Sequence, residues 1–176
     1  MTEPRLFLIG DVVGFSPQIG RLVSMMNYAR WTILRDVEGL SVAQLDHLFD
    51  SKSNSIGALL LHIAAVETAF QVATFENREL DSTERTQWDA ALELGERARL
   101  EIQGNDLNYY VSLLGTVREK TFSGFLERED AWLYEESPFW KDRPANNYFK
   151  WFHVFEDEIN HRGQIRWLRK RIVERV

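Results

Sequence analysis

The sequence predicts an all-α protein that folds as a four-helix bundle with short extra helices and an extended N-terminal arm. Four long segments carry apolar residues at spacings of three and four, the period of an amphipathic helix. Strand patterns are nearly absent after residue 16. The 176 residues are 44% hydrophobic and 27% charged, which suits a single domain over residues 1–176 with a substantial core. Helices that each have one apolar face can bury that face together in a bundle.

The N-terminal segment leads into the first long helix. Residues 1–15 include LFLIGDVVGF, an apolar stretch with two glycines, which predicts an extended arm or a short strand. Ser16 followed by Pro17 is typical of a helix start, with serine as the N-cap and proline at the first helical position. The helix continues to about Glu38, and Gly39 ends it. Its apolar stripe consists of Leu22, Met25, Met26, Ala29, Ile33 and Val37.

The second long helix is predicted to be the most buried. A capping-box pattern, Ser41 to Gln44, first predicts a short helix. The second long helix then runs from about Ser55 to about Phe75 and is apolar almost all round. Residues 76–104 are the most polar stretch and predict a connection that crosses the bundle. Its helical part is expected from about Trp88 to about Leu100.

The third helix is predicted from about Asp106 to about Arg128 and the fourth from about Asn147 to about Glu174. The loop DAWLYEESPFWKDRPANN between them is rich in aromatic residues. Because the connection between the second and third helices is long, those two helices can run parallel. No internal repeat is evident in the sequence.

The overall charge argues against a nucleic-acid-binding protein. The net charge is -6 and the pI is about 5.3, so a broadly basic surface is not expected. A basic run does end the fourth helix, where cations complement the helix dipole. It consists of Arg166, Arg169, Lys170 and Arg171.

The chain contains no cysteine, so it has neither a disulfide nor a thiol nucleophile of its own. Any metal must therefore be held by nitrogen and oxygen ligands. No uninterrupted apolar run approaches the ~18 residues of a membrane span, and the N-terminus lacks a signal-peptide pattern. A cytoplasmic protein with no membrane partner is the expectation.

The fourth helix contains the clearest candidate site, in HVFEDEINHRGQI. Asp157 and His161 are four residues apart, so their side chains lie within ~40° of each other on the helix. His153 and Asp157 have the same spacing and remain a geometric alternative. His153 and His161 are about 12 Å apart along the axis and do not converge easily on one ion.

A third ligand must come from another helix. His62 lies in the apolar second helix, where a buried histidine needs a polar partner. His47 lies in a short polar segment and is predicted to be exposed. From these residues alone, a metal site and ordinary hydrogen-bonded histidines remain open alternatives.

Four segments resemble the DinB-like superfamily of four-helix metalloproteins. They are GLSVAQLD, NSIGALLLHIAAVE, YYVSLLGTVREKTFSGF and HVFEDEINHRGQIRWLRKR, in that order along nearly the whole chain. The resemblance implies an up-down-down-up bundle that often forms a homodimer. Trp151 and Trp167 are predicted to be exposed and agree with a dimer.

The resemblance also implies a metal site of three histidines, one on the second helix and a His-x-x-x-His pair on the fourth. The matching positions are His62, Asp157 and His161, so one histidine of the pattern is replaced by aspartate. His153 matches a frequent extra histidine that is not usually a ligand. Related mycothiol-dependent members carry a carboxylate at the middle position. Two histidines and a carboxylate suit a divalent ion: zinc or nickel first, with iron or manganese as alternatives.

The chemistry implied by the resemblance is the joining of a low-molecular-weight thiol, of the bacillithiol or mycothiol type, to a small electrophile. A metal-dependent hydrolase is an alternative, because an open metal position also activates water. A non-enzymatic metal-binding or stress-response bundle is a further one.

Several other residues are candidates to surround the site. Tyr28 and Trp31 on the first helix are candidates to line a pocket. Glu67 lies five residues after His62 and is expected to orient a ligand or bridge to another helix. Arg162 follows His161, and a surface ion pair is favoured over contact with an anionic substrate.

Overall fold

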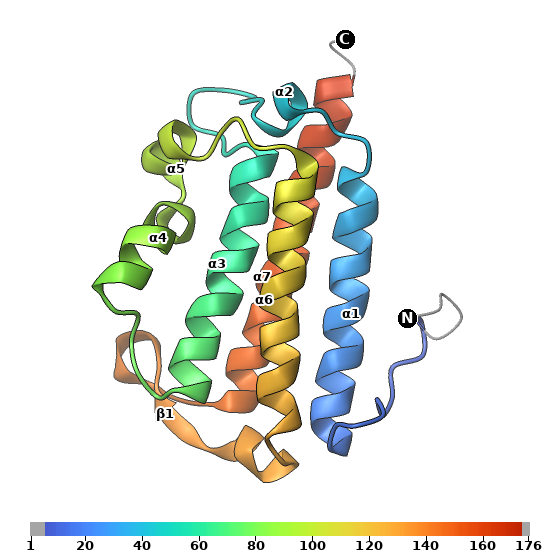
Figure 1. Cartoon of the computed structure of the whole chain (residues 1–176), viewed down its shortest axis with the longest axis vertical. Coiled ribbons are helices and arrows are strands. Elements are labelled where there is room, and N and C mark those ends of the chain that lie inside the picture. Colours follow the sequence, from blue (N-terminus) through green and yellow to red (C-terminus); the bar gives the residue numbers. More distant parts are fainter. Residues whose placement is uncertain (1–5, 174–176) are drawn as a thin grey trace.

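The predicted fold class is confirmed by the structure, a computed structural model that describes residues 6–173. Four long helices form an up-down-down-up bundle (Figure 1). They are α1 (Pro17–Val37), α3 (Ile56–Phe75), α6 (Leu107–Leu126) and α7 (Asn147–Val173). Each of α1 and α3 packs against both α6 and α7, so the α3/α7 seam lies opposite the α1/α6 seam. The helices α3 and α6 run parallel, as the long connection predicted.

The start of α1 is capped differently from the prediction. Ser16 makes no side-chain cap bond; its hydroxyl instead donates to Asp130 Oδ1 (2.6 Å). The same carboxylate oxygen accepts the backbone N–H groups of Gln18 (2.9 Å) and Ile19 (3.2 Å). The predicted N-cap position of Ser16 and the proline after it are confirmed, but a carboxylate distant in sequence, not the serine hydroxyl, accepts the free N–H groups of the first turn.

The N-terminal arm is extended over its described part, and residues 1–5 of the predicted arm lie outside the described residues. No strand forms in residues 6–16. Phe7 makes edge-to-face ring contacts with Tyr28 (6.1 Å) and Trp31 (5.9 Å) of α1. Further along, α2 (Val42–Leu45) begins with the predicted capping box of Ser41 and Gln44.

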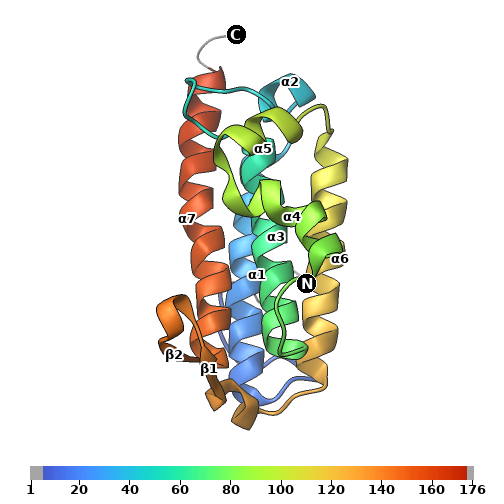
Figure 2. The same ribbon diagram turned by 90° about the vertical axis from the view of Figure 1, so that its left-hand side faces the viewer.

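The connection between α3 and α6 contains two helices where one was predicted. They are α4 (Ser82–Glu93) and α5 (Gly95–Glu101), and they lie over α3 (Figure 2). The break falls at Leu94, whose φ of 57° and ψ of -150° are not helical. The predicted continuous helix from Trp88 to Leu100 is therefore wrong.

The aromatic loop before α7 has regular structure that was not predicted. It contains two 3-10 turns, η2 (Asp130–Tyr134) and η3 (Trp140–Asp142). It also contains a two-stranded antiparallel hairpin of β1 (Glu136–Pro138) and β2 (Pro144–Asn146). The hairpin lies beside the beginning of α7 (Figure 2).

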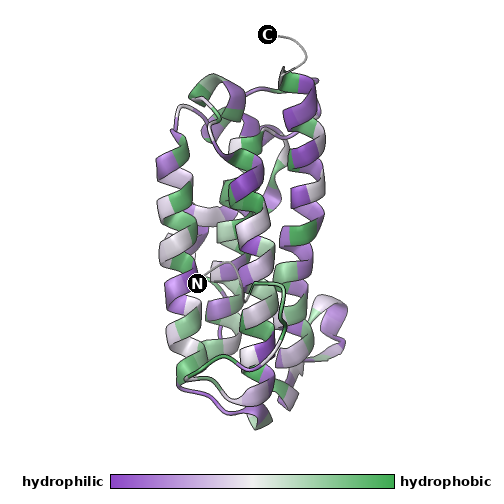
Figure 3. Ribbon diagram, turned by 90° about the vertical axis from the view of Figure 1, so that its right-hand side faces the viewer, coloured by the Kyte–Doolittle hydropathy of each residue, from purple (hydrophilic) through white to green (hydrophobic). Residues whose placement is uncertain are grey.

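The core consists of two apolar clusters along the bundle axis. One contains Ile33, Leu59 and Tyr110, and the other contains Leu22, Phe125 and Trp151. Trp151 is fully buried, so the prediction that it is exposed is wrong; Trp167 is 43% exposed. Apolar and hydrophilic residues alternate around the helices (Figure 3). The helix α3 is long and apolar enough to span a membrane, but 67% of that window is buried inside the bundle, as in the core helix of a soluble protein.

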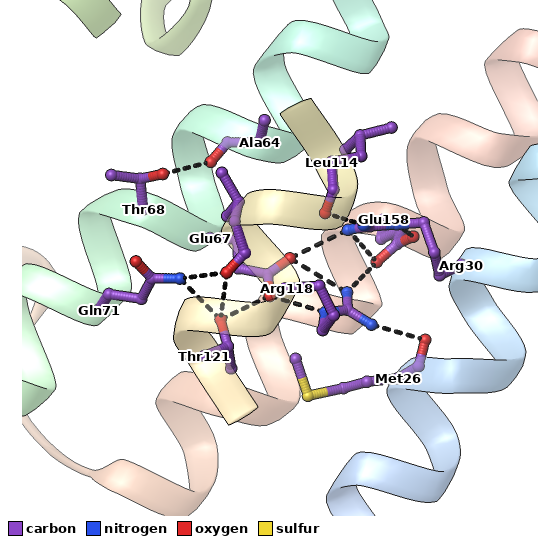
Figure 4. A network of polar contacts seen from close by, with 11 residues as sticks. Met26, Arg30, Ala64, Glu67, Thr68, Gln71, Leu114, Arg118, Thr121 and Glu158 are labelled. Atoms are coloured by element: carbon purple, nitrogen blue, oxygen red, sulfur yellow. Dashed lines mark hydrogen bonds and ion pairs between the residues drawn. The ribbon is translucent and has the colours of Figure 1, made fainter. Parts of the chain in front are cut away.

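A network of buried charges joins all four long helices (Figure 4). Its members are Arg30 of α1, Glu67 of α3, Arg118 of α6 and Glu158 of α7, all buried. Thr121 also donates to Glu67 (2.6 Å). Burial alone would lower the pKa of Arg118, but Glu67 and Glu158 hold this pKa above its ordinary value. Two cations and two anions compensate each other inside the core.

The bonds of this network occur in reciprocal pairs. Arg30 Nε donates to Glu158 (2.6 Å), and Arg118 Nε donates to Glu67 (2.7 Å). Arg30 Nη2 donates to Glu67 (3.0 Å), and Arg118 Nη2 donates to Glu158 (2.9 Å). Each Nη1 donates to the other arginine's helix, at the carbonyl four residues before that arginine. The hairpin α1–α3 and the hairpin α6–α7 are therefore related by an approximate two-fold axis through the network.

The two-fold relation extends to the helix starts. Ser55, twelve residues before Glu67, caps α3 by accepting the N–H three residues later. Asn146, twelve residues before Glu158, does the same for α7, accepting from Phe149 N (2.9 Å). The expectation of no internal repeat thus holds for the sequence but misses a structural one.

Candidate metal centre

The three predicted ligands lie together on the α3/α7 seam. His62, Asp157 and His161 each offer one ligand atom, and these atoms all lie within 4.8 Å of one another. His62 Nε2 is 3.5 Å from Asp157 Oδ2, and His161 Nε2 is 3.3 Å from Asp157 Oδ1. The spacing of four on α7 brings Asp157 and His161 to one face, and α3 supplies His62 opposite them.

The imidazole of His62 is oriented by the connection between the bundle halves. Its Nδ1 lies 2.8 Å from the carbonyl oxygen of Ala91 in α4. A carbonyl only accepts, so Nδ1 carries a proton, and Nε2, which faces Asp157, is the ring nitrogen available to a metal. The Ala91 carbonyl is available because the helix breaks at Leu94 and Gly95 N donates to Asn54 instead (3.1 Å). Metal-binding histidines are commonly held in this way.

The carboxyl of Asp157 is held in its ionised form. Burial by itself would raise its pKa, but the neighbouring imidazoles of His161 and His62 outweigh burial and hold the pKa of Asp157 well below its usual range. An anionic oxygen beside two imidazoles is a donor set that suits zinc and similar ions.

Two buried atoms of the cluster lack a hydrogen-bond partner. They are Asp157 Oδ2 and His161 Nδ1. With one ligand atom taken from each side chain, the three atoms lie within 4.8 Å of one another, close enough to surround one ion. The three side chains are 11–20% exposed, so a small molecule can reach the cluster from solvent. The residues present therefore fit a divalent ion.

His153 lies outside this cluster. Its Nδ1 is 3.0 Å from Glu156 of the same helix, and its ring lies among three phenylalanines. The ring centroids are 5.9 Å from Phe70, 6.0 Å from Phe139 and 6.2 Å from Phe149. It is a packing residue of the seam one turn before Asp157.

Glu67 was predicted either to orient a ligand or to bridge helices, and the structure places it in the bridging role. Its hydrogen-bond partners belong to the buried network and come from α1 and α6. Burial would raise the pKa of Glu67, but Arg118 and Arg30 hold it below its ordinary value. It has no described contact with His62.

The remaining candidates face other parts of the bundle. Trp31 lines a cavity of about 410 Å³ at the α1/α6 seam, on the opposite side from the cluster, and Tyr28 contacts the N-terminal arm. Arg162 donates to the Thr32 hydroxyl (2.8 Å); no carboxylate in the described part of the chain pairs with it, so the predicted ion pair is wrong. His47 is partly buried rather than exposed.

Sequence reasoning missed the arginines that balance the core glutamates. Arg30 and Arg118 interrupt apolar helix faces and were not singled out. The available signal was Glu67, a carboxylate inside an apolar helix, which must find a cation if it is buried.

The comparisons with known proteins agree with this fold. A crystal structure of a conserved protein from Enterococcus faecalis matches with a TM-score of 0.67 at 16% sequence identity, covering 87% of this chain and 95% of that chain. At this identity the likeness shows the fold alone. No curated protein matches the chain. The model of the mycothiol-S-transferase family, a DinB-like family, matches residues 21–173. Because this match spans most of the chain, the protein belongs to the mycothiol-S-transferase family.

Proposed function

We propose that the protein is a metal-dependent thiol S-transferase in which His62, Asp157 and His161 hold a divalent ion, zinc or nickel being the most suitable. The observation that carries this proposal is the convergence of the three side chains from α3 and α7, with Asp157 Oδ2 buried and without a hydrogen-bond partner. The family match supports the thiol as substrate.

The reaction joins a low-molecular-weight thiol to a small electrophile. The S–H bond of the thiol and the bond from carbon to the leaving group break, an S–C bond forms, and the proton and leaving group depart. A divalent ion at the cluster supplies Lewis acidity, which favours the thiolate form of the incoming thiol. The chain has no cysteine, so the sulfur comes from the substrate.

The residues of the chain perform three tasks in this proposal. His62, fixed by the Ala91 carbonyl, presents Nε2 in a constant orientation. Asp157 supplies one negative charge, and the two imidazoles are neutral ligands. The sum of these charges with a divalent ion would be positive, which would attract a thiolate. With only three protein ligands, a bound ion would keep one coordination position open to substrate.

The first test measures metal binding. Protein purified without a histidine tag should take up one zinc or nickel ion per chain. Asp157→Ala should weaken this affinity by at least about 10-fold, as even substitutions around metal ligands do. His153→Ala is the matched control for metal affinity, because it removes a side chain from the same face of α7 one turn away. If Asp157→Ala keeps full affinity while His153→Ala loses it, the ligand assignment is wrong.

The second test measures conjugation. The metal-loaded protein should accelerate the reaction of mycothiol with an alkyl halide above the rate without protein, and a chelator should abolish the acceleration. Ester or amide hydrolysis without conjugation would favour the metal-dependent hydrolase instead. Absence of any divalent metal uptake would favour a non-enzymatic bundle.

A further inference from the structure

The α3/α7 seam continues beyond the metal centre as two facing columns of side chains. On α7 the column is Phe149, His153, Asp157 and His161, each four residues from the next. On α3, which runs the opposite way, it is His62, Val66 and Phe70. Positions four apart share one helix face. The contact between the rings of Phe70 and His153 (5.9 Å) shows that the columns face each other below the metal centre.

The approximate two-fold axis relates the two ends of this seam. His62 lies five residues before Glu67, and His153 lies five residues before Glu158. The counterparts of Asp157 and His161 on α3 are Val66 and Phe70, an apolar pair. The seam therefore has two equivalent positions: one with three metal donors, and one in which two of the donors are replaced by apolar side chains.

The second position opens onto a cavity. We call the side chains of Phe70, Phe139, Phe149 and His153 the aromatic box, since their rings contact one another at 5.6–6.2 Å. A cavity of about 450 Å³ beside it is lined by Phe139, Phe149 and Trp140 together with hairpin residues. Trp140 is 75% exposed and Phe149 is 44% exposed, so these aromatic surfaces are available to a ligand.

We propose that the aromatic box and its cavity bind the electrophile as a planar aromatic or conjugated group. This inference rests on the proposed function, because it names the substrate class of the same reaction. His153 is one helical turn, ~5.4 Å along the axis, from Asp157. Phe149, which lines the cavity, is one turn further from Asp157, so an electrophile whose ring lies in the cavity extends along His153 toward the candidate metal centre, where the thiol sulfur attacks it. Aromatic walls recognise such rings by offset stacking and edge contacts.

The test uses benzyl alcohol, an unreactive aromatic probe, so that binding is measured without catalysis. The protein has only four histidines, so imidazole NMR signals resolve individually, and that of His153 is assigned from a His153→Ala variant. Benzyl alcohol should shift the His153 signal in a saturable way and leave the signal of His47 unchanged. Absence of a shift at His153 would overturn the proposal.

A pair of variants separates the box from general surface aromaticity. Phe149→Ala should weaken benzyl alcohol binding by about 3- to 10-fold, the loss expected for an aromatic pair. Tyr109→Ala is the matched control, because Tyr109 is 45% exposed and lies on α6. Equal effects of the two variants would overturn the proposal. Both residues are exposed enough for the variants to fold, which circular dichroism checks.

Kinetics link the box to the reaction. In Phe149→Ala the KM for a benzyl halide should rise by a similar factor, while the KM for the thiol and the metal content stay unchanged. A raised KM for the thiol alone would contradict the assignment of the box to the electrophile. The unmodified protein could also bind benzyl alcohol at His153 and yet show no conjugation. That result would contradict the proposed function and leave the aromatic site supported.

Discussion

Replacing Glu67 by glutamine should destabilise the protein by about 3–5 kcal/mol, the usual cost of removing one partner from a buried ion pair. The substitution keeps the shape of the side chain but removes its charge. Two buried guanidinium groups would then face one carboxylate, Glu158, and the core would hold one uncompensated positive charge.

The hydrogen bonds of Glu67 give a second, independent value. Oε1 accepts from Arg118 Nε (2.7 Å) and Thr121 (2.6 Å), while Oε2 accepts from Arg30 Nη2 (3.0 Å) and Arg118 Nη2 (3.1 Å). A glutamine retains one oxygen, so two of these bonds are lost. If both were charge-assisted, at about 1.5–3 kcal/mol each, their sum would be about 3–6 kcal/mol. If the bond from the Thr121 hydroxyl is one of the two that are lost, the sum lies toward the lower end of this range.

Urea denaturation measures the effect. For an m-value of about 2 kcal/mol/M, the midpoint should fall by about 1.5–2.5 M. The double variant Glu67→Gln with Arg118→Met restores charge balance, so its cost should be less than the sum of the single costs by about 1 kcal/mol or more. Glu101→Gln is the control: it breaks an exposed pair with Arg97 (2.8 Å) and should barely move the midpoint.

The pH dependence follows from the pKa of Glu67, which is lower in the folded protein than its ordinary value. A lowered pKa contributes stability that is present above the unfolded pKa, about 4.3, and is lost as the pH falls toward the folded pKa. Stability of the unmodified protein should therefore fall below about pH 4, and the glutamine variant should lack that part of the fall. A variant within 1 kcal/mol of the unmodified protein at neutral pH, or full additivity in the double variant, would refute the role assigned to the network.

Three further substitutions have defined outcomes. Gly57→Ala places a Cβ 2.6 Å from the hydroxyl of the buried Tyr110. It should lower the unfolding free energy by about 1–3 kcal/mol, although alanine has the better helix propensity. A gain in melting temperature would contradict this. Arg169→Ala removes hydrogen bonds to three carbonyls at the end of α1 and should cost about 1 kcal/mol in urea denaturation, with no change in metal content. Asp157→His should tighten zinc binding in a competition titration, since it completes a three-imidazole set; weaker binding would show that the seam is shaped for a carboxylate.

The long helices and the grouping of the candidate ligands could be predicted from the sequence because both depend largely on local spacing. Capping residues and apolar stripes placed α1, α3, α6 and α7 within a few residues of their observed bounds. The pair Asp157 and His161 follows from the turn of one helix, and His62 from the need of a buried histidine for a partner. The burial of Trp151 was missed because the start of α7 carries aromatic residues on several faces, and their type does not show which face is buried.

The features that could not be predicted depend on contacts between distant segments. Asp130 caps α1 from more than a hundred residues away. In the sequence, Arg30 and Arg118 look like solvent-exposed residues at the edge of an apolar stripe. Only the fold shows that they pair with Glu67 and Glu158 in the core. The two-fold relation is carried by a few equivalent positions, such as His62 and His153, while their neighbours differ. Leucine does not favour a positive φ, so the residue type at position 94 did not indicate the break between α4 and α5.

The bond between His62 and the Ala91 carbonyl changes how the connecting segment should be regarded. Connections between helices usually tolerate insertions and deletions, because they run over the surface without carrying the arrangement of the core. Here the register of α4 decides which carbonyl faces the imidazole, and the reversal at Leu94 leaves that carbonyl free. A single residue added between positions 82 and 91 would rotate α4 by ~100° and present a different group to His62. The length of this segment is therefore constrained by the orientation of His62 at the candidate metal centre, although none of its side chains belongs to the cluster.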